Sequence, residues 1–387
     1  MKTRRGNLTL YLIMILFTAH VSALSTIVAE LSNEPGVGVS GSGLIFTVNY
    51  IGYILCALPC GALADRFGKK PVLLAGLGGA AVFFALFASV SSFPMHCLMM
   101  FFLGGCGGVV NCITAGYIGD LNQDNPDYYT NFLQMLACIG AIASPFLLSL
   151  LISLGVQWRY YYYLLSLLTV VFAVLLIVFV PNTEKREGER FSFGKAFSAM
   201  KGVFLLACLC MFCYTGAEVA TWGWLSSLLK TEFASSTLLS GLGVSLFWVG
   251  MTAGRYVCGR LLKRITMERL LIVLSALAAL VTLGALFCRT AGVFLIMAVL
   301  LGLACSSTFP FLSSYGAART TLGTGMSFTL LMVCGNTGSA IVPYFVGLLS
   351  ERIGMTSSMA LPMVLFAAVG VIVTGIALSS RKTAQKR

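Results

Sequence analysis

One carboxylate interrupts a long apolar and aromatic run near the middle of the chain. The run reads FCYTGAEVATWGW over residues 212–224, and its acid is Glu218. If this run crosses a membrane, the acid is costly to keep there, and such residues usually face a cavity or a partner. A carboxyl in that position can bind and release a proton and can hydrogen-bond a polar solute. Glu218 is therefore the first candidate for chemistry.

Uncharged polar and aromatic residues in other apolar runs could share a solute site with this acid. Amides both donate and accept hydrogen bonds, which suits the hydroxyl groups of a neutral polar solute. Trp222 lies one helical turn after the acid on the same face, where an indole can stack on a ring of such a solute. The predicted substrate-binding residues are Glu218, Trp222, Asn111, Gln134 and Asn336. Each amide taken alone is more often a contact between helices, so both interpretations stay open.

The scarcity of basic residues at the depth of Glu218 also bears on its role. No Lys or Arg lies at a comparable depth in the apolar runs, although Arg255 is near the inner third of the eighth run. Water, polar side chains and solute hydroxyls are therefore its expected stabilisers. His20, in the first run, is interpreted as a hydrogen-bonded packing residue rather than a titrating group.

The composition indicates that these residues belong to an integral membrane protein. Of 387 residues, 58% are hydrophobic and 10% are charged, whereas soluble domains carry about 25% charged residues. A helix needs roughly 20 apolar residues to cross a bilayer. The sequence predicts twelve such spans, at residues 8–30, 41–63, 72–92, 95–119, 129–154, 160–181, 202–229, 238–262, 269–288, 292–314, 323–349 and 356–379.

The distribution of basic residues predicts the orientation of the spans. If the N-terminus is cytoplasmic, 21 of the 25 Lys and Arg residues lie on the cytoplasmic side, and Arg159, Lys230, Arg289 and Arg352 lie outside. This is the asymmetry of the positive-inside rule, and it places both termini in the cytoplasm. The net charge of +12 then reflects topology and the anionic inner leaflet rather than a nucleic-acid partner. The first 23 residues also resemble a secretory signal, but their removal would leave eleven spans, so we expect them to form the first span.

The chain divides into two halves of similar size. The longest polar interruption predicts a cytoplasmic linker at residues 182–201 with a short amphipathic segment, between an N-terminal six-helix half (1–181) and a C-terminal six-helix half (202–387). The link after span two, GALADRFGKK, has a degenerate copy after span eight, GRLLKRITME, 198 residues later. Two such halves, related by an axis along the membrane normal, are typical of one large transporter architecture.

The link after span two has a physical logic of its own. Gly61 permits close approach of two helices, and Gly68 permits a tight turn. Asp65 can accept hydrogen bonds from a helix N-terminus or pair with an arginine, while Arg66 favours a cytoplasmic position. A plain basic turn between two spans is the alternative interpretation.

In this position of a twelve-span chain, the link closely resembles the loop signature of the major facilitator superfamily. The resemblance implies the major facilitator fold, with Asp65 latching the cytoplasmic side by interacting with a helix of the other half. Gly61, Asp65, Arg66 and Gly68 would form this cytoplasmic gate motif. In the second copy Lys263 stands where the aspartate would be, so no equivalent latch is carried over.

Further stretches resemble the fucose permease group of sugar:proton symporters within that superfamily. They include TNFLQMLACIGAIASPFL, WRYYYYL, GAEVATWGWLSSLL, GRYVCGRLL and GLACSSTFPFLSS. In span four the group usually carries an acid followed four residues later by an asparagine, and this chain has Asn111 and Ala115 at those places. Proton symport through span four is therefore in doubt, which leaves Glu218 as the proton-coupling candidate and a uniporter as the alternative if Glu218 is dispensable.

Other function classes find little support in the sequence. A membrane-embedded enzyme would need a nucleophile–base pair or a metal set at membrane depth, and two distant histidines with one buried acid supply neither. The thirteen cysteines lie singly in apolar runs and are interpreted as reduced packing residues. We expect no metal and no cofactor.

The sequence thus predicts a monomeric, multi-pass secondary transporter of the plasma membrane, the inner membrane of a bacterial cell. It would move a small polar solute, a sugar or a related compound, by alternating access, with a coupling proton as a second ligand. Efflux of drugs or metabolites on the same fold is the alternative, since aromatic cavities with a single acid also suit cationic amphiphiles.

Overall fold

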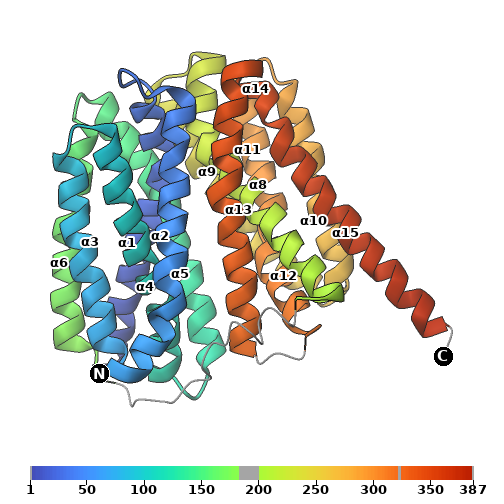
Figure 1. Ribbon diagram of the computed structural model, residues 1–387, viewed down its shortest axis with the longest axis horizontal. Helices are drawn as coiled ribbons and strands as arrows, with labels where there is room; N and C mark the ends of the chain where they lie inside the picture. The colour runs from blue at the N-terminus through green and yellow to red at the C-terminus, as the bar shows by residue number, and fades with distance from the viewer. Residues whose placement is uncertain (1, 183–199, 321–323, 386–387) are drawn as a thin grey trace. The chain divides into compact units, whose positions relative to one another are not determined.

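The structure is a computed structural model that describes residues 2–182, 200–320 and 324–385. Its elements are helices connected by short turns (Figure 1). They are α1 (Lys2–Leu31), α2 (Gly38–Phe67), α3 (Lys69–Ser89), α4 (Phe93–Leu121), α5 (Pro126–Ser153), α6 (Trp158–Phe179), α8 (Gly202–Phe233), α9 (Thr237–Leu261), α10 (Met267–Leu286), α11 (Ala291–Cys305), α12 (Thr308–Ala317), α13 (Thr324–Ile353), α14 (Met355–Ser358) and α15 (Ala360–Gln385).

The prediction of an all-α membrane protein with twelve spans is confirmed. Twelve helical stretches of the described chain are long and apolar enough to cross a membrane, and the described residues contain no strand. Each of these stretches corresponds to one predicted apolar run. In lipid, the backbone N–H and C=O groups of a span find hydrogen-bond partners only within the helix, so an apolar run of spanning length forms a helix. The tenth span differs from a simple helix, since it consists of α11 and α12 with a break at residues 306–307.

The chain forms two compact units. The first comprises Met1–Arg190 with Ser236–Ser245, and the second comprises Phe191–Ser235 with Leu246–Arg387. The start of α9 thus belongs to the first unit, although the predicted division assigns it to the C-terminal half. The predicted linker, residues 182–201, lies mostly outside the described residues, and so does its predicted amphipathic segment.

Glycines bring helices into close contact at equivalent places in the two units. At each of them, a Cβ atom would overlap a backbone carbonyl of the facing helix, so only glycine allows the helices to approach this closely. The second-unit glycine lies 198 residues after its first-unit counterpart in every case, the same offset as the repeated link. The pairs are Gly52 and Gly250, Gly104 and Gly302, and Gly140 and Gly338.

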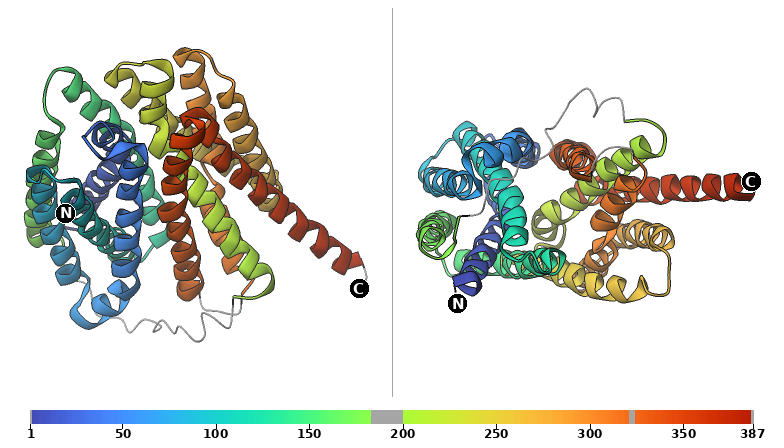
Figure 2. Two further views of the ribbon diagram at one scale, coloured as in Figure 1. Left: turned by 45° about the horizontal axis from the view of Figure 1, so that its top comes forward. Right: turned by 90° about the horizontal axis from the view of Figure 1, so that it is seen from below.

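Helix α8 carries the predicted acid and lies at the centre of the second unit. It packs against α13, α15 and α12, which explains why its sequence is apolar on all sides. Two of its side chains donate hydrogen bonds to α13: Thr215 to the carbonyl of Gly335, and Trp224 to the carbonyl of Pro343. The C-terminal turns of α15, red in Figures 1 and 2, extend away from the other helices of this unit.

Candidate functional site

Glu218 occupies an exceptional position on α8. It is the only residue from Cys213 to Leu229 that is not buried, and its side chain is partly accessible. A carboxyl inside an otherwise buried helix segment needs either water or polar partners. The structure supplies two polar partners.

The tenth span is interrupted close to this acid, between α11 and α12. Pro310 lacks an N–H group, so the carbonyl of Ser306, four residues earlier, loses its helical donor. The guanidinium of Arg255 on α9 takes that place, since its Nε atom donates to the Ser306 carbonyl at 3.2 Å. The neighbouring carbonyl of Cys305 accepts a hydrogen bond from the Tyr214 hydroxyl on α8. The two carbonyls at the break are therefore hydrogen-bonded by side chains of α9 and of α8, the helix that carries Glu218.

Tyr214 and Arg255 also act on the Glu218 carboxyl. Tyr214 lies one helical turn before Glu218, and its hydroxyl is within hydrogen-bonding reach of the carboxyl. The positive charge of Arg255 interacts with the same carboxyl. Arg255, which the sequence places near the inner third of the eighth run, is thus the basic residue whose charge acts on this acid, from α9.

The Tyr214 hydroxyl links the proton on Glu218 to the helix break. It has a single proton, so it can donate to only one acceptor at a time. When Glu218 is ionised, the hydroxyl can donate to the carboxylate. When Glu218 is protonated, the carboxyl can donate to the hydroxyl oxygen, and the hydroxyl then donates to the Cys305 carbonyl. The two protonation states thus permit different hydrogen bonds at the α11–α12 break.

The aromatic and amide residues predicted in the second unit differ in accessibility. Trp222 is buried, with 2% of its surface exposed, and its ring centroid lies 6.0 Å from that of Trp248 on α9. Trp248 is half-buried, and so is Asn336 on α13. In this conformation a solute ring can therefore reach Trp248 more easily than Trp222.

The predicted amides of the first unit lie on two helices with different surroundings. Asn111 on α4 is half-buried and lines a small cavity together with His20 and Asn49. Gln134 on α5 is exposed and does not line that cavity. The structure therefore brings Asn111 together with His20, which the sequence interpretation treated as a packing residue.

The gate motif forms the junction between α2 and α3. Gly68 ends α2 and precedes α3 with φ 93° and ψ 153°, a left-handed backbone conformation that favours glycine. Asp65 and Arg66 are exposed, and the Arg66 guanidinium lies 5.2 Å from the Phe67 ring centroid. No described atom lies within 4 Å of the place where a Gly61 Cβ would stand. The close helix contact expected at Gly61 is therefore not made here, and Gly52 makes it instead.

An ion pair next to this motif recurs in the second unit with reversed charges. Lys69, the first residue of α3, binds Asp120 at the end of α4 at 2.5 Å. Glu268 at the start of α10 binds Arg319, which follows α12, at 2.6 Å. Each residue of the second pair lies 199 positions after its counterpart, so the repeat conserves the position of the bridge and reverses its polarity.

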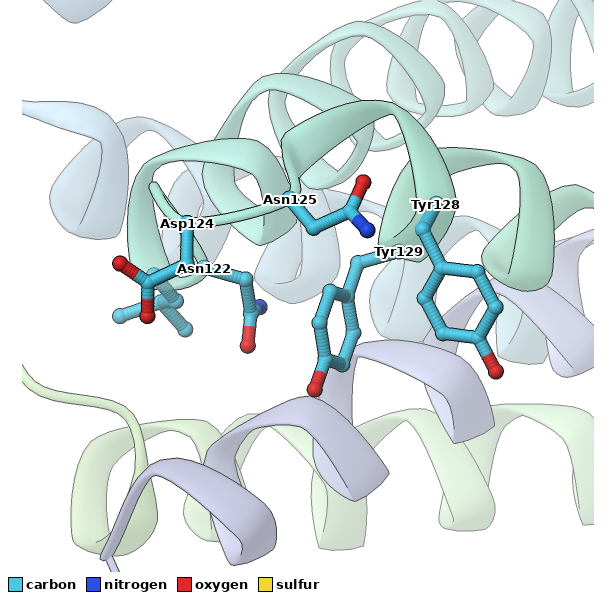
Figure 3. A pocket seen from close by; sticks show the side chains of 6 residues that line it. Asn122, Asp124, Asn125, Tyr128 and Tyr129 are labelled. Atoms are coloured by element: carbon cyan, nitrogen blue, oxygen red, sulfur yellow. The ribbon is translucent and has the colours of Figure 1, made fainter.

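A larger hollow, of about 540 Å³, lies at the connection between α4 and α5 (Figure 3). Its wall includes Asn122, Asp124, Asn125 and the rings of Tyr128 and Tyr129. Asn122 also exchanges two hydrogen bonds with Asn7 of α1, at 2.9 and 3.0 Å. None of the predicted solute residues is among the described residues that line this hollow.

Sequence reasoning missed Tyr214 and ranked His20 low. A signal for Tyr214 was present, because it precedes Glu218 by four residues and so shares its helical face. The role of Arg255 could be anticipated only from the position of Pro310, which frees the Ser306 carbonyl.

Twelve spans, glycine contacts repeated at an offset of 198 residues, and an intramembrane acid beside a broken helix together define the class. This is the architecture of a secondary transporter built from two repeated halves. The sequence profile of the Major Facilitator Superfamily matches residues 10–328 and 207–386. The chain belongs to the Major Facilitator Superfamily.

Known relatives agree with this assignment. The chain is 24% identical over 367 residues to a glucose/galactose transporter of Brucella abortus, covering 88% of this chain and 86% of the relative. It is 24% identical over 375 residues to the L-fucose-proton symporter of Escherichia coli, covering 85% and 83%. The crystal structure of the E. coli fucose:proton symporter aligns with a TM-score of 0.62 at 19% identity, covering 94% of this chain and 97% of that one. The predicted resemblance to the fucose permease group is confirmed.

Proposed function

We propose that this transporter moves a sugar or a related polyhydroxylated compound together with a proton. Membership of the superfamily and similarity to a glucose/galactose transporter and an L-fucose-proton symporter support this proposal. Transport proceeds by alternating access between two six-helix halves, residues 1–181 and 202–387. The protein works as a carrier without enzymatic chemistry, as a monomer in the plasma membrane with both termini in the cytoplasm.

The observation that carries the coupling proposal is the position of Glu218. It is half-buried within an otherwise buried segment, beside the Tyr214 hydroxyl and the Arg255 charge. Partial accessibility gives a proton a route to the carboxyl, and the polar partners lower the cost of the ionised form. Asn111 cannot carry a proton in span four, so Glu218 is the coupling group.

Loading and release of the proton act on the helix break in α11–α12. A protonated Glu218 directs the Tyr214 proton to the Cys305 carbonyl, and an ionised Glu218 attracts that proton to its own carboxylate. Discontinuous spanning helices line the sites of many transporters, and at such a break no continuous ladder of backbone hydrogen bonds fixes the angle between the two segments. The proton on Glu218 thereby selects between two arrangements of α12 relative to α11.

The solute contacts that we propose are hydrogen bonds and ring stacking. Asn111, Gln134 and Asn336 supply amides that donate to and accept from hydroxyl groups, and Glu218 adds a carboxyl. Trp222 supplies an aromatic face once it is uncovered, and its neighbour Trp248 supplies one in the conformation described. Uncharged partners of this kind bind a neutral polar solute without a counter-charge.

The gate proposal rests on Gly61, Asp65, Arg66 and Gly68. The left-handed turn at Gly68 fixes the direction of α3, and Lys69 anchors that helix to Asp120. Asp65, exposed at the end of α2, remains available to an interaction that forms and breaks during the transport cycle.

Counterflow in proteoliposomes tests the substrate class. Vesicles are loaded with one unlabelled compound, and entry of the same labelled compound is measured for D-glucose, D-galactose, L-fucose, a nucleoside and a cationic dye. We expect counterflow of at least one of the three sugars and none of the dye. Counterflow of the dye without any sugar would replace the proposal by efflux of cationic amphiphiles.

A further inference from the structure

His20 on α1 is a buried histidine whose hydrogen-bonding capacity is not met by the described chain. Its exposed fraction is 1%. The rings of Phe84 and Tyr162 pack against it edge-on, with centroid distances of 4.9 and 5.8 Å. Neither ring nitrogen has a hydrogen-bond partner among the described residues. An unmet polar group of this kind is costly in a protein interior, so water or a polar group of a solute would stabilise His20 if it can reach the ring.

The imidazole lines the cavity that also contains Asn111. This cavity, of about 50 Å³, is lined by residues of α1, α2 and α4 within the first unit and is partly open. Two other polar groups in its wall already have backbone partners. Asn49 donates to the carbonyl of Met100 at 3.3 Å, and Thr18 donates to the carbonyl of Ala137 at 2.6 Å. The half-buried Asn111 contrasts with the buried His20, so accessibility decreases from the amide to the imidazole.

The size and the chemistry of the cavity define what it accepts. A water molecule occupies about 30 Å³ in the liquid, so 50 Å³ holds one or two waters or one small polar group. A complete sugar ring is larger than that. A neutral imidazole offers one donor and one acceptor, and a hydroxyl group offers the same pair. One hydroxyl can therefore satisfy His20 on one side and the Asn111 amide on the other.

We propose that this cavity is a subsite for one hydroxyl-bearing end of the transported solute, with His20 as its specificity-determining residue. The inference rests on the proposed function and assigns the place where one hydroxyl group of the solute binds. A solute hydroxyl enters past Asn111, displaces water and hydrogen-bonds the imidazole, while the rest of the solute remains outside the cavity. An analogue that lacks this hydroxyl leaves His20 unpaired and binds less well.

A comparison of sugars with their monodeoxy analogues tests the subsite. Competition with counterflow is measured for wild type, His20→Leu and His20→Gln, using whichever of D-glucose, D-galactose and L-fucose is transported. Wild type should discriminate about 10- to 100-fold against one monodeoxy analogue. His20→Leu should lose that discrimination, and His20→Gln should recover part of it, since its amide still donates and accepts.

His96→Leu is the matched control for this experiment. His96 is also buried and lies among aromatic rings, those of Phe87 and Trp158, but it does not line the cavity. Its replacement should leave the discrimination unchanged. If wild type transports a sugar and His20→Leu discriminates as well as wild type, the subsite is refuted while the proposed function stands. If wild type moves none of the three sugars, both are refuted.

A second measurement observes His20 in the wild-type protein and needs a variant only to assign its signals. The chain contains two histidines, so ¹⁵N-imidazole labelling gives a spectrum with two assignable sites, and His96→Leu identifies the signals of His20. Addition of the transported sugar should shift the nitrogen resonances of His20 and leave those of His96 in place. A saturating sugar that leaves the His20 resonances unchanged would overturn the subsite.

Discussion

The repeated glycine contacts make a quantitative prediction about helix packing. Gly104 on α4 faces the carbonyl of Asn49 on α2, and Gly302 on α11 faces the carbonyl of Phe247 on α9. In both places a Cβ would overlap backbone atoms, which cannot move aside as a flexible side chain can. Replacement by alanine therefore forces the two helices apart.

Overpacking of this kind costs about 1 to 3 kcal/mol. For a unit of this size, that corresponds to a fall in melting temperature of about 2 to 12 °C. We expect Gly104→Ala and Gly302→Ala to fall in this range, each through its own unit. The assay is thermal unfolding of the purified protein in detergent. The folded fraction that remains after each heating step is measured by size-exclusion chromatography with fluorescence detection.

Gly78→Ala is the matched control. Gly78 lies within α3, is exposed, and has no described atom within 4 Å of its Cβ position. Alanine should there be neutral or stabilising by up to about 1 kcal/mol, because glycine is the poorer helix former. Equal melting temperatures for Gly104→Ala and Gly78→Ala would refute the packing argument.

Substitutions at three further places test the site and its supports. Tyr214→Phe should lower stability by about 1 to 3 kcal/mol, since it leaves the Cys305 carbonyl without its donor, and should alter the pH profile of uptake; an unchanged profile would disconnect Tyr214 from Glu218. Asp120→Lys should destabilise the first unit by up to about 1 kcal/mol, and the double exchange Lys69→Asp with Asp120→Lys should recover most of that loss in thermal unfolding, whereas additive losses would show that the pair does not interact. Gly68→Ala should cost about 1 to 3 kcal/mol because of its left-handed backbone, and a melting temperature equal to that of wild type would contradict the turn conformation.

The fold was predictable from the sequence because the bilayer imposes a length on each span. Twelve apolar runs gave twelve spanning helices, and the repeated link pointed to a repeat that the glycine pairs extend. The break in the tenth span was harder to foresee, since a proline in a spanning helix produces a kink as readily as a break. The two compact units also depend on packing, which is why the start of α9 groups with the first unit.

The candidate site was predictable in part. Glu218 stood out because an acid within a long apolar run is costly. Its partners were less visible: Tyr214 precedes it by one turn, but Arg255 lies on α9, and its hydrogen bond to the Ser306 carbonyl depends on the break between α11 and α12. His20 shows the same limit, since its cavity is formed by three helices that are distant in sequence.

The central claim is that Glu218 binds the coupling proton, and the most direct test separates exchange from accumulation. Wild type, Glu218→Gln and the control Glu232→Gln, in the last turn of the same helix, are reconstituted, and sugar-driven proton entry is recorded together with counterflow. We predict that Glu218→Gln retains counterflow but loses proton entry and concentrative uptake, whereas Glu232→Gln resembles wild type. Sugar-driven proton entry at the wild-type rate in Glu218→Gln would contradict the claim.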